Sequence, residues 1–225
     1  MMINAQNLRK TYRADRERLA AVDGAVFSCR KGDYVSIVGH SGSGKSTLLS
    51  LLGGLTRPDS GSIVIDGTDI LALSDNDLAE FRNRKLNFIF QFASLMPTLT
   101  ALENVILPTA FSPDPRPRQE TAREAAELLA AVGLQDKLKA YPGQLSGGQQ
   151  RRVAIARAFI NHPQIILADE PTGDLDEETE AEMIELFRRI NRERQVTFVV
   201  VTHNSAMAAE AQKMLIMRNG VLQEA

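Results

Sequence analysis

The chain has 225 residues, a length that suits one globular domain with a substantial buried core. Its 26 basic and 28 acidic residues leave a net charge of −2, which gives no basic footprint for a nucleic-acid partner. A single cysteine excludes an intrachain disulfide framework, and neither a signal peptide nor an apolar run of roughly 20 residues is evident, so we expect a cytoplasmic chain.

Near the start, Tyr12 offers an aromatic ring that could stack on a nucleotide base; the alternative is a strand aromatic packed on the core. Residues 34–38 are typical of a short buried strand that leads into a glycine-rich loop, and residues 48–52 predict a helix that ends at Gly53. Strand, loop and helix in this order are the context in which such a loop binds phosphate.

In this loop the glycines allow backbone N–H groups to approach an anion. Lys45 would neutralise the β- and γ-phosphates, and the Ser46 hydroxyl would bind Mg²⁺. A flexible turn is the alternative interpretation. The candidate phosphate-binding residues are Gly39, Ser41, Gly42, Ser43, Gly44, Lys45, Ser46 and Thr47.

Polar side chains follow three other short apolar runs that we expect to be strands. Asp169 and Glu170 end one run, and two adjacent carboxylates there are costly unless a cation or water lies beyond them. We assign Asp169 to Mg²⁺ and Glu170 to the attacking water as general base. Gln91 could touch Mg²⁺ or its water, and His203 could donate to a γ-phosphate oxygen. A solvated turn, a surface glutamine and a structural histidine are the alternatives.

Between residues 92 and 163 the composition changes, and we interpret this segment as a mostly helical subdomain inserted into an α/β core. Four prolines between Pro108 and Pro117 predict an exposed loop. Residues 120–132 predict a helix capped by Gly133. A second helix is expected over residues 146–160.

The start of that second helix carries Leu145-Ser146-Gly147-Gly148-Gln149. Ser146 can cap the helix, the two glycines expose backbone N–H groups, and the helix dipole adds positive potential. The stretch therefore indicates a second phosphate-binding surface, and an ordinary glycine-rich turn is the alternative.

Towards the end of the chain, residues 179–191 predict a helix. Residues 196–201 predict a strand of a parallel sheet that is covered on both faces. Asn219-Gly220, between apolar segments of residues 213–224, is typical of a type I′ hairpin.

Taken in order, these motifs resemble the ATP-binding-cassette (ABC) transporter ATPases over essentially the whole chain. The matching motifs are the adenine-stacking Tyr12, the Walker A loop at 39–47, the Q-loop at Gln91, the signature at 145–149, the Walker B strand at 165–170, the D-loop at 173–176 with Asp176, and the switch His203. The resemblance implies a P-loop NTPase (RecA-like) α/β core with a mainly parallel sheet, an N-terminal antiparallel β part and an inserted helical subdomain. We expect one domain over 1–225, with the core at 1–91 and 164–225 and the helical subdomain at 92–163.

The resemblance also implies an ATP hydrolase that uses ATP and Mg²⁺ and drives a membrane transporter. Two copies would close head to tail, so that one protomer's signature serves its partner's ATP. The residues expected to act across this interface are Ser146, Gly148 and Gln149, and Gly147 and Asp176 are further candidate nucleotide-binding residues. An integral membrane subunit would dock between Gln91 and Thr100, placing the chain on the inner face of the cell membrane.

Residues 88–92, 95–105 and 168–176 are similar to the lipoprotein-release, macrolide-efflux and cell-division branch, which more often has Asn where Asp174 stands. Export, lipoprotein release or mechanotransmission is therefore the expected task. A regulatory envelope-remodelling complex without transported substrate and a nutrient importer stay open as alternatives. A member that acts on DNA or the ribosome is disfavoured, because neither a second ATPase domain nor a long coiled-coil insertion is evident.

Overall fold

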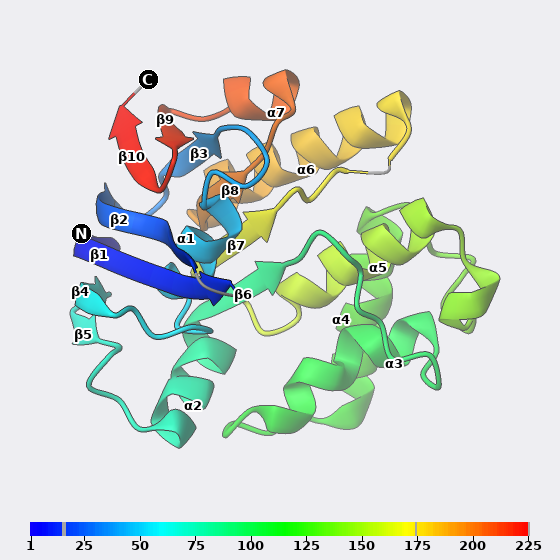
Figure 1. Cartoon of the computed structure of the whole chain (residues 1–225). Coiled ribbons are helices and arrows are strands. Elements are labelled where there is room, and N and C mark those ends of the chain that lie inside the picture. Colours follow the sequence, from blue (N-terminus) through cyan, green and yellow to red (C-terminus); the bar gives the residue numbers. More distant parts are fainter. Residues whose placement is uncertain (15–16, 174, 225) are drawn as a thin grey trace.

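The computed structural model describes residues 1–14, 17–173 and 175–224. Within these ranges the strands form two sheets, one of four strands in the order β2-β1-β4-β5 and one of six in the order β10-β9-β3-β8-β7-β6 (Figure 1). The antiparallel sheet consists of β1 (Ile3–Ala14), β2 (Glu17–Cys29), β4 (Ser60–Ile65) and β5 (Thr68–Asp69). The larger sheet consists of β3 (Tyr34–Val38), β6 (Leu86–Ile89), β7 (Ile165–Asp169), β8 (Thr197–Val201), β9 (Lys213–Arg218) and β10 (Val221–Glu224).

The larger sheet is parallel from β9 to β6, and only β10 runs antiparallel to its neighbour among the described strands. A parallel sheet is normally covered on both faces, and strand β8 shows this, because every one of its residues is buried. Val199 and Val201 face the core that also holds α1 (Lys45–Leu52) and the antiparallel sheet. Phe198 and Val200 face the opposite core, with α5 (Gly147–Phe159) and α6 (Glu177–Arg194). The mixed α/β architecture expected from the sequence is confirmed.

Helices α3 (Ala101–Ile106), α4 (Arg118–Ala131) and α5 pack against one another at one end of the molecule (Figure 1). Among the described residues, the remaining α-helices are α2 (Asp75–Lys85) and α7 (Ser205–Ala209), and a short 3₁₀ helix covers Pro142–Gln144. In the described part of the chain, none of the helices is both long and apolar enough to cross a bilayer.

The proline-rich stretch was expected to be an exposed loop, and its first residues correct that expectation. A 3₁₀ helix covers Leu107–Phe111, with Pro108 near its start. Proline suits this position, because its fixed φ is helical and its missing N–H would have no partner in the first turn. The rest of the stretch, up to the start of α4, carries no helix or strand.

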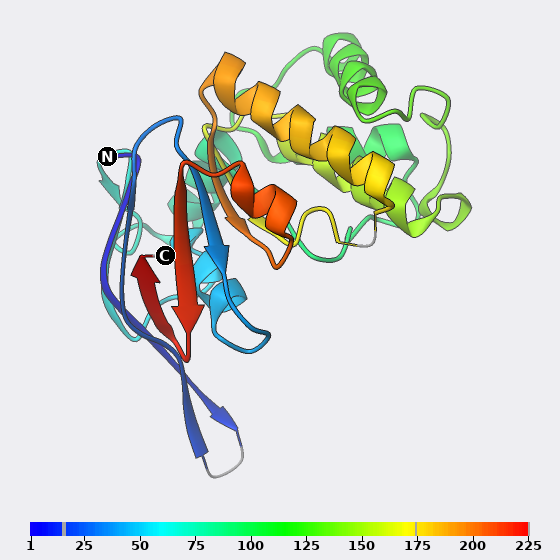
Figure 2. The same ribbon diagram turned by 90° about the horizontal axis from the view of Figure 1, so that it is seen from above.

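The predicted hairpin near the C-terminus is confirmed in detail. Arg218 pairs with Val221, so the loop has two residues, and both take positive φ: 47° at Asn219 and 81° at Gly220. These are the signs that a type I′ turn requires. At the other end of the chain, β1 and β2 form a longer hairpin that projects from the body (Figure 2).

Candidate nucleotide-binding site

The glycine-rich loop joins the end of β3, in the middle of the larger sheet, to the first residue of α1. Gly44 takes φ +104°, and a Cβ there would lie 1.9 Å from the carbonyl oxygen of Ala21 in β2. Only glycine fits this close approach. Gly42 also takes a positive φ, +77°, but nothing lies within 4 Å of its Cβ position, so this side of the loop is open to a ligand.

Lys45 stands at the N-terminus of α1 with its ammonium group turned back over the loop. Its Nζ donates to the carbonyl oxygens of Gly39 at 2.7 Å and His40 at 2.9 Å. Both acceptors are neutral, so a phosphate arriving above the loop would offer this cation a stronger partner. The loop thus holds the Lys45 ammonium group beside the backbone N–H groups at the N-terminus of α1, where an anion can bind.

Asp169, the last residue of β7, lies beside the hydroxyl group of Ser46 of α1. Burial raises the pKa of Asp169, and the neighbouring Glu170 raises it further, whereas Ser46 and Lys45 lower it. A half-buried carboxylate next to another carboxylate and a hydroxyl is a set of hard oxygen donors that fits Mg²⁺. In the described ranges no three acidic, histidine or cysteine side chains gather as a metal cluster. Mg²⁺ needs no such cluster, because it keeps waters and phosphate oxygens as ligands.

Glu170 is held in place by the segment that follows β8. Its Oε2 accepts from the Thr202 hydroxyl at 3.1 Å and from the His203 backbone N–H at 3.3 Å, and its Oε1 lies 2.8 Å from His203 Nδ1. Glu170 has φ +47°, an uncommon value for a residue with a side chain. The carboxylate is 15% exposed and the His203 side chain 79% exposed, so the histidine covers it from the solvent side.

These residues line one cleft of about 680 Å³, a size that suits a nucleotide. The predicted site residues that line it are Tyr12, Gly39, Ser41, Gly42, Gly44, Lys45, Ser46, Thr47, Gln91, Asp169, Glu170 and His203. Ser43 is the exception within the loop, because its side chain is buried and its hydroxyl has no partner within the described residues.

Sequence reasoning missed two residues of the cleft wall, Leu19 and Ala21, and named a third, Gly173, only as part of the D-loop. Leu19 pairs directly with Tyr12 across the β1–β2 hairpin, and both side chains are exposed. Together they offer an apolar platform at the mouth of the cleft. Predicting the register of the β1–β2 hairpin would have identified Leu19, because this register places it opposite Tyr12.

The signature residues Ser146, Gly147, Gly148 and Gln149 and the D-loop residue Asp176 do not line this cleft. Ser146 caps α5: its Oγ accepts from Gln149 N at 3.2 Å, and Gln149 Oε1 accepts from Ser146 N at 2.9 Å. Asp176 caps α6 by accepting from Thr179, and these bonds lower its pKa. Asp174, which stands where the related branch more often has Asn, lies outside the described residues.

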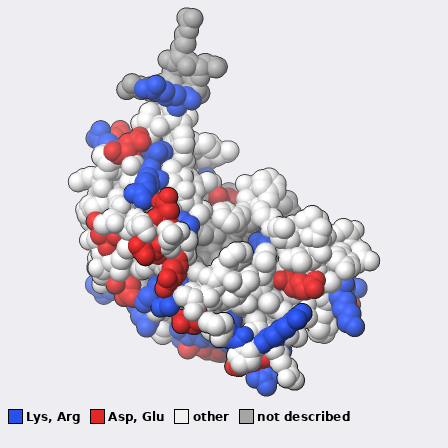
Figure 3. All heavy atoms as spheres, turned by 90° about the horizontal axis from the view of Figure 1, so that it is seen from below, with Lys and Arg blue, Asp and Glu red and all other residues white. Residues whose placement is uncertain are grey.

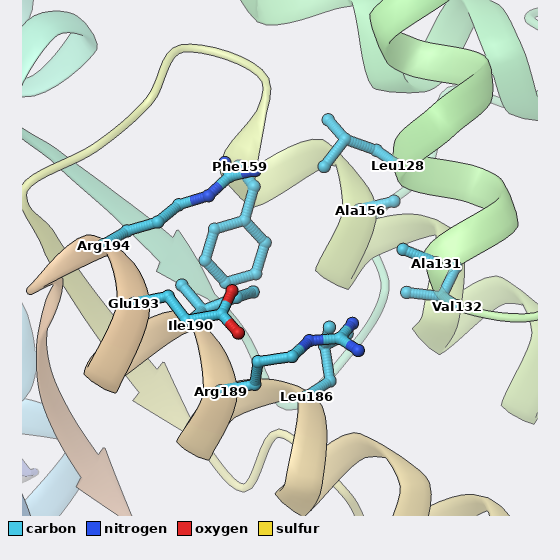
Figure 4. A pocket seen from close by; sticks show the side chains of 10 residues that line it. All are labelled: Leu128, Ala131, Val132, Ala156, Phe159, Leu186, Arg189, Ile190, Glu193 and Arg194. Carbon is cyan, nitrogen blue, oxygen red and sulfur yellow. The ribbon is translucent and has the colours of Figure 1, made fainter.

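A second hollow, of about 340 Å³, lies between α4, α5 and α6 and holds none of the predicted site residues (Figure 4). Its floor is apolar, with Phe159 and Leu186, and the charged Arg189, Glu193 and Arg194 stand at its rim. On the face drawn in Figure 3, acidic and basic side chains are interspersed.

Comparison with known proteins supports this geometry. Residues 22–173 match the model of the ABC transporter family. The chain is 48% identical to the lipoprotein-releasing system ATP-binding protein LolD of Porphyromonas gingivalis, over 99% of both chains. It is 45% identical to the macrolide export ATP-binding/permease protein MacB of Rhodopirellula baltica, over 99% of this chain and 33% of that protein.

Among solved structures, the ATP-binding cassette MJ0796 superposes with a TM-score of 0.94 at 39% identity, over 99% of this chain and 98% of that one. That structure is a dimer in a post-hydrolysis state, bound to ADP and Pi. From the matched motifs, the shared fold and the full-length relatives, the chain belongs to the ABC transporter family, as an ATPase of the LolD and MacB type.

Proposed function

We propose that the chain hydrolyses ATP as the motor subunit of a membrane transporter of the lipoprotein-release or macrolide-export type. The observation that carries this proposal is the meeting of Lys45, Ser46, Asp169 and Glu170 in one cleft. A phosphate cradle, a site for a hard cation and a carboxylate base are the parts that ATP hydrolysis needs.

In the proposed reaction the open amides at the start of α1 bind the phosphates of ATP. Lys45 exchanges its two loop carbonyls for the β- and γ-phosphate oxygens. Ser46 and Asp169 would hold Mg²⁺, with Gln91 close by, and the ion would supply charge neutralisation at the transferred phosphoryl group. The adenine would stack on the exposed apolar platform that Tyr12 and Leu19 form.

Glu170 would act as the general base that orients and deprotonates the attacking water. The bonds from Thr202 and His203 hold its carboxylate in one direction, as a base requires before a water is placed. His203 Nδ1 already hydrogen-bonds this carboxylate, which puts the imidazole where it could also reach a γ-phosphate oxygen. His203 and Glu170 would then both act at the γ-phosphate of the same ATP.

Two copies would share each ATP. The chain has one signature, Leu145–Gln149, and it begins a helix outside the cleft that holds Lys45. The dimeric state of the MJ0796 cassette supports this arrangement. Residues 92–163 would be the subdomain that carries the signature, and residues 1–91 and 164–225 the core. Contacts among α3, α4 and α5 favour that division.

The membrane subunit would dock beside Gln91, placing this chain on the inner face of the membrane. Phe92 is 75% exposed and Met96 48% exposed, which leaves apolar surface for a partner. Leu95 instead packs against the core of the helices, so it supports the surface from below.

Replacing Glu170 with Gln tests the hydrolytic role, because the amide keeps the shape but cannot accept the proton. We expect turnover to fall by roughly 10²–10⁴-fold while ATP binding persists and an ATP-dependent dimer accumulates. Phosphate release and light scattering after size exclusion measure the two effects. Glu193→Gln, at an exposed position of α6 that does not line this cleft, is the control and should behave like the parent. Parental turnover in Glu170→Gln would exclude the base role.

A further inference from the structure

Arg157 of α5 ties down the segment that follows Gln91. Its guanidinium donates to two consecutive main-chain carbonyls, from Nη1 to Ser94 at 2.9 Å and from Nη2 to Ala93 at 2.9 Å. This segment forms neither helix nor strand, and Ser94 has φ +45°, which a serine keeps only when its surroundings hold it. The planar fork of a guanidinium allows one side chain to hold both carbonyls.

The same arginine stands in an environment that disfavours a charge. It is partly buried, burial lowers its pKa, and within the described residues it forms no ion pair. A cation without a carboxylate partner loses hydration that two hydrogen bonds to neutral carbonyls offset only in part. An apolar side chain would fill the space at lower cost, so the observed contacts point to a role in holding this segment.

Arg151, also from α5, holds the other side of Gln91. Its Nη1 donates to the carbonyl of Phe90 at 2.7 Å and lies 3.5 Å from the carbonyl of Glu170. The side chain is only 3% exposed. One helix therefore fixes the backbone immediately before Gln91 and the backbone two and three residues after it.

We propose that Arg157 is a positioning residue for Gln91: by fixing the carbonyls of Ala93 and Ser94 to α5, it keeps the Gln91 side chain at the cleft. The inference rests on the proposed function, in which Gln91 contacts Mg²⁺ or its water. Because α5 begins directly after Ser146, the same contacts make the position of Gln91 depend on that of the signature. A shift of α5 would carry both together.

Limited proteolysis of the nucleotide-free protein tests the structural step. In Arg157→Met the segment loses its two anchors, so we expect chymotrypsin to cleave between residues 90 and 96 about tenfold faster than in the parent. The matched control is Arg152→Met, which removes an arginine of the same helix that donates to the Val132 carbonyl at 3.2 Å. Mass spectrometry locates the cuts, and the control should be cleaved there at the parental rate.

The Mg²⁺ dependence of ATP hydrolysis tests the functional step. Loss of an outer-shell partner typically weakens metal binding by about 10–100-fold, so Arg157→Met should raise the half-maximal Mg²⁺ concentration about tenfold. Affinity for ATP without Mg²⁺ should stay parental. Gln91→Ala should shift the Mg²⁺ dependence similarly, and the double variant should shift it no further. Arg157→Lys keeps the charge but replaces the planar two-pronged guanidinium with a single ammonium group on a shorter side chain, so an intermediate shift is expected.

Each outcome decides the matter. Parental cleavage in Arg157→Met, or additive shifts in the double variant, would overturn the positioning role. A shifted Gln91→Ala beside a parental Arg157→Met would overturn it while leaving the proposed function intact. An unshifted Gln91→Ala would remove the metal role of Gln91 and this inference with it. If Arg157→Met does not fold, the same comparisons are made with Arg157→Lys.

Discussion

At the scale of single residues, Lys45 shows how the loop is prepared for its ligand. The ammonium group is bonded to two carbonyls of its own loop, Gly39 and His40, and so stays in the cleft. Little reorganisation is then needed when a phosphate arrives, because the cation only exchanges acceptors.

Lys45→Ala should therefore weaken ATP binding itself. A hydrogen bond to a charged group contributes about 1.5–3 kcal/mol, so the Kd should rise roughly 10–100-fold. Titration with a fluorescent ATP analogue measures the change. Lys213→Ala is the control, since that lysine pairs with Glu224 on the far strands of the sheet. An unchanged Kd in Lys45→Ala would remove its phosphate role.

Site residues at the ends of strands were predictable from the sequence. A polar side chain directly after a buried apolar strand is costly unless a ligand, a cation or water lies beside it. Asp169, Glu170 and His203 were found in this way, and they line the cleft as expected. Leu19 was not found, because a lone apolar residue carries no motif. Its place opposite Tyr12 follows only from the register of the β1–β2 hairpin.

At the scale of elements, the strands and helices that bury many residues were the ones that the sequence predicted well. Strands β3, β7 and β8 are mostly apolar and buried, and they were identified with nearly the observed bounds. Helix α2 was missed because it is strongly polar and buries only Leu78. Helices α3 and α7 have six and five residues, too few for a periodic pattern, and tertiary contacts stabilise them.

Strand β2 carries the single cysteine, and its environment makes a prediction about reactivity. Cys29 is buried at the end of the strand, and burial raises the pKa of its thiol from 9.0 to about 12. The thiolate is the reactive form, so this shift alone lowers its population near neutral pH about 1,000-fold. Folded protein should resist alkylation by iodoacetamide, whereas protein in denaturant should react fully. Rapid alkylation of the native chain, followed by mass spectrometry, would contradict this.

At the scale of the whole molecule, the signature and the phosphate loop belong to different parts of one chain. Ser146 caps α5 with its own Gln149, and neither residue lines the cleft around Lys45. Sequence could place both motifs and, through family resemblance, suggest that they meet across a dimer. It could not show that they lie apart within a protomer, because that separation depends on how α5 packs in three dimensions.

Ser146→Arg tests whether a second copy completes the site. The bulky cation should leave ATP binding by the monomer intact but block closure, so hydrolysis should be lost. Ser74→Arg removes the comparable cap of α2, where Ser74 accepts from Asp77 N, and should retain turnover. This control separates the loss of a helix cap from the loss of a shared site.

Mixing two inactive variants makes the test stronger. Lys45→Ala spoils the phosphate loop and Ser146→Arg spoils the signature, so a mixed dimer keeps one complete site: the loop of the Ser146→Arg protomer against the signature of the Lys45→Ala protomer. Random pairing of equal amounts gives half mixed dimers with one site of two, so about a quarter of parental turnover should return if the sites act independently. Neither variant alone should recover when its concentration is doubled. If mixed dimers form but mixing restores nothing, two explanations follow: each protomer hydrolyses ATP without its partner's signature, or the two sites work only together. A tandem fusion of one parental and one Ser146→Arg copy distinguishes them. It should retain turnover in the first case and lose it in the second.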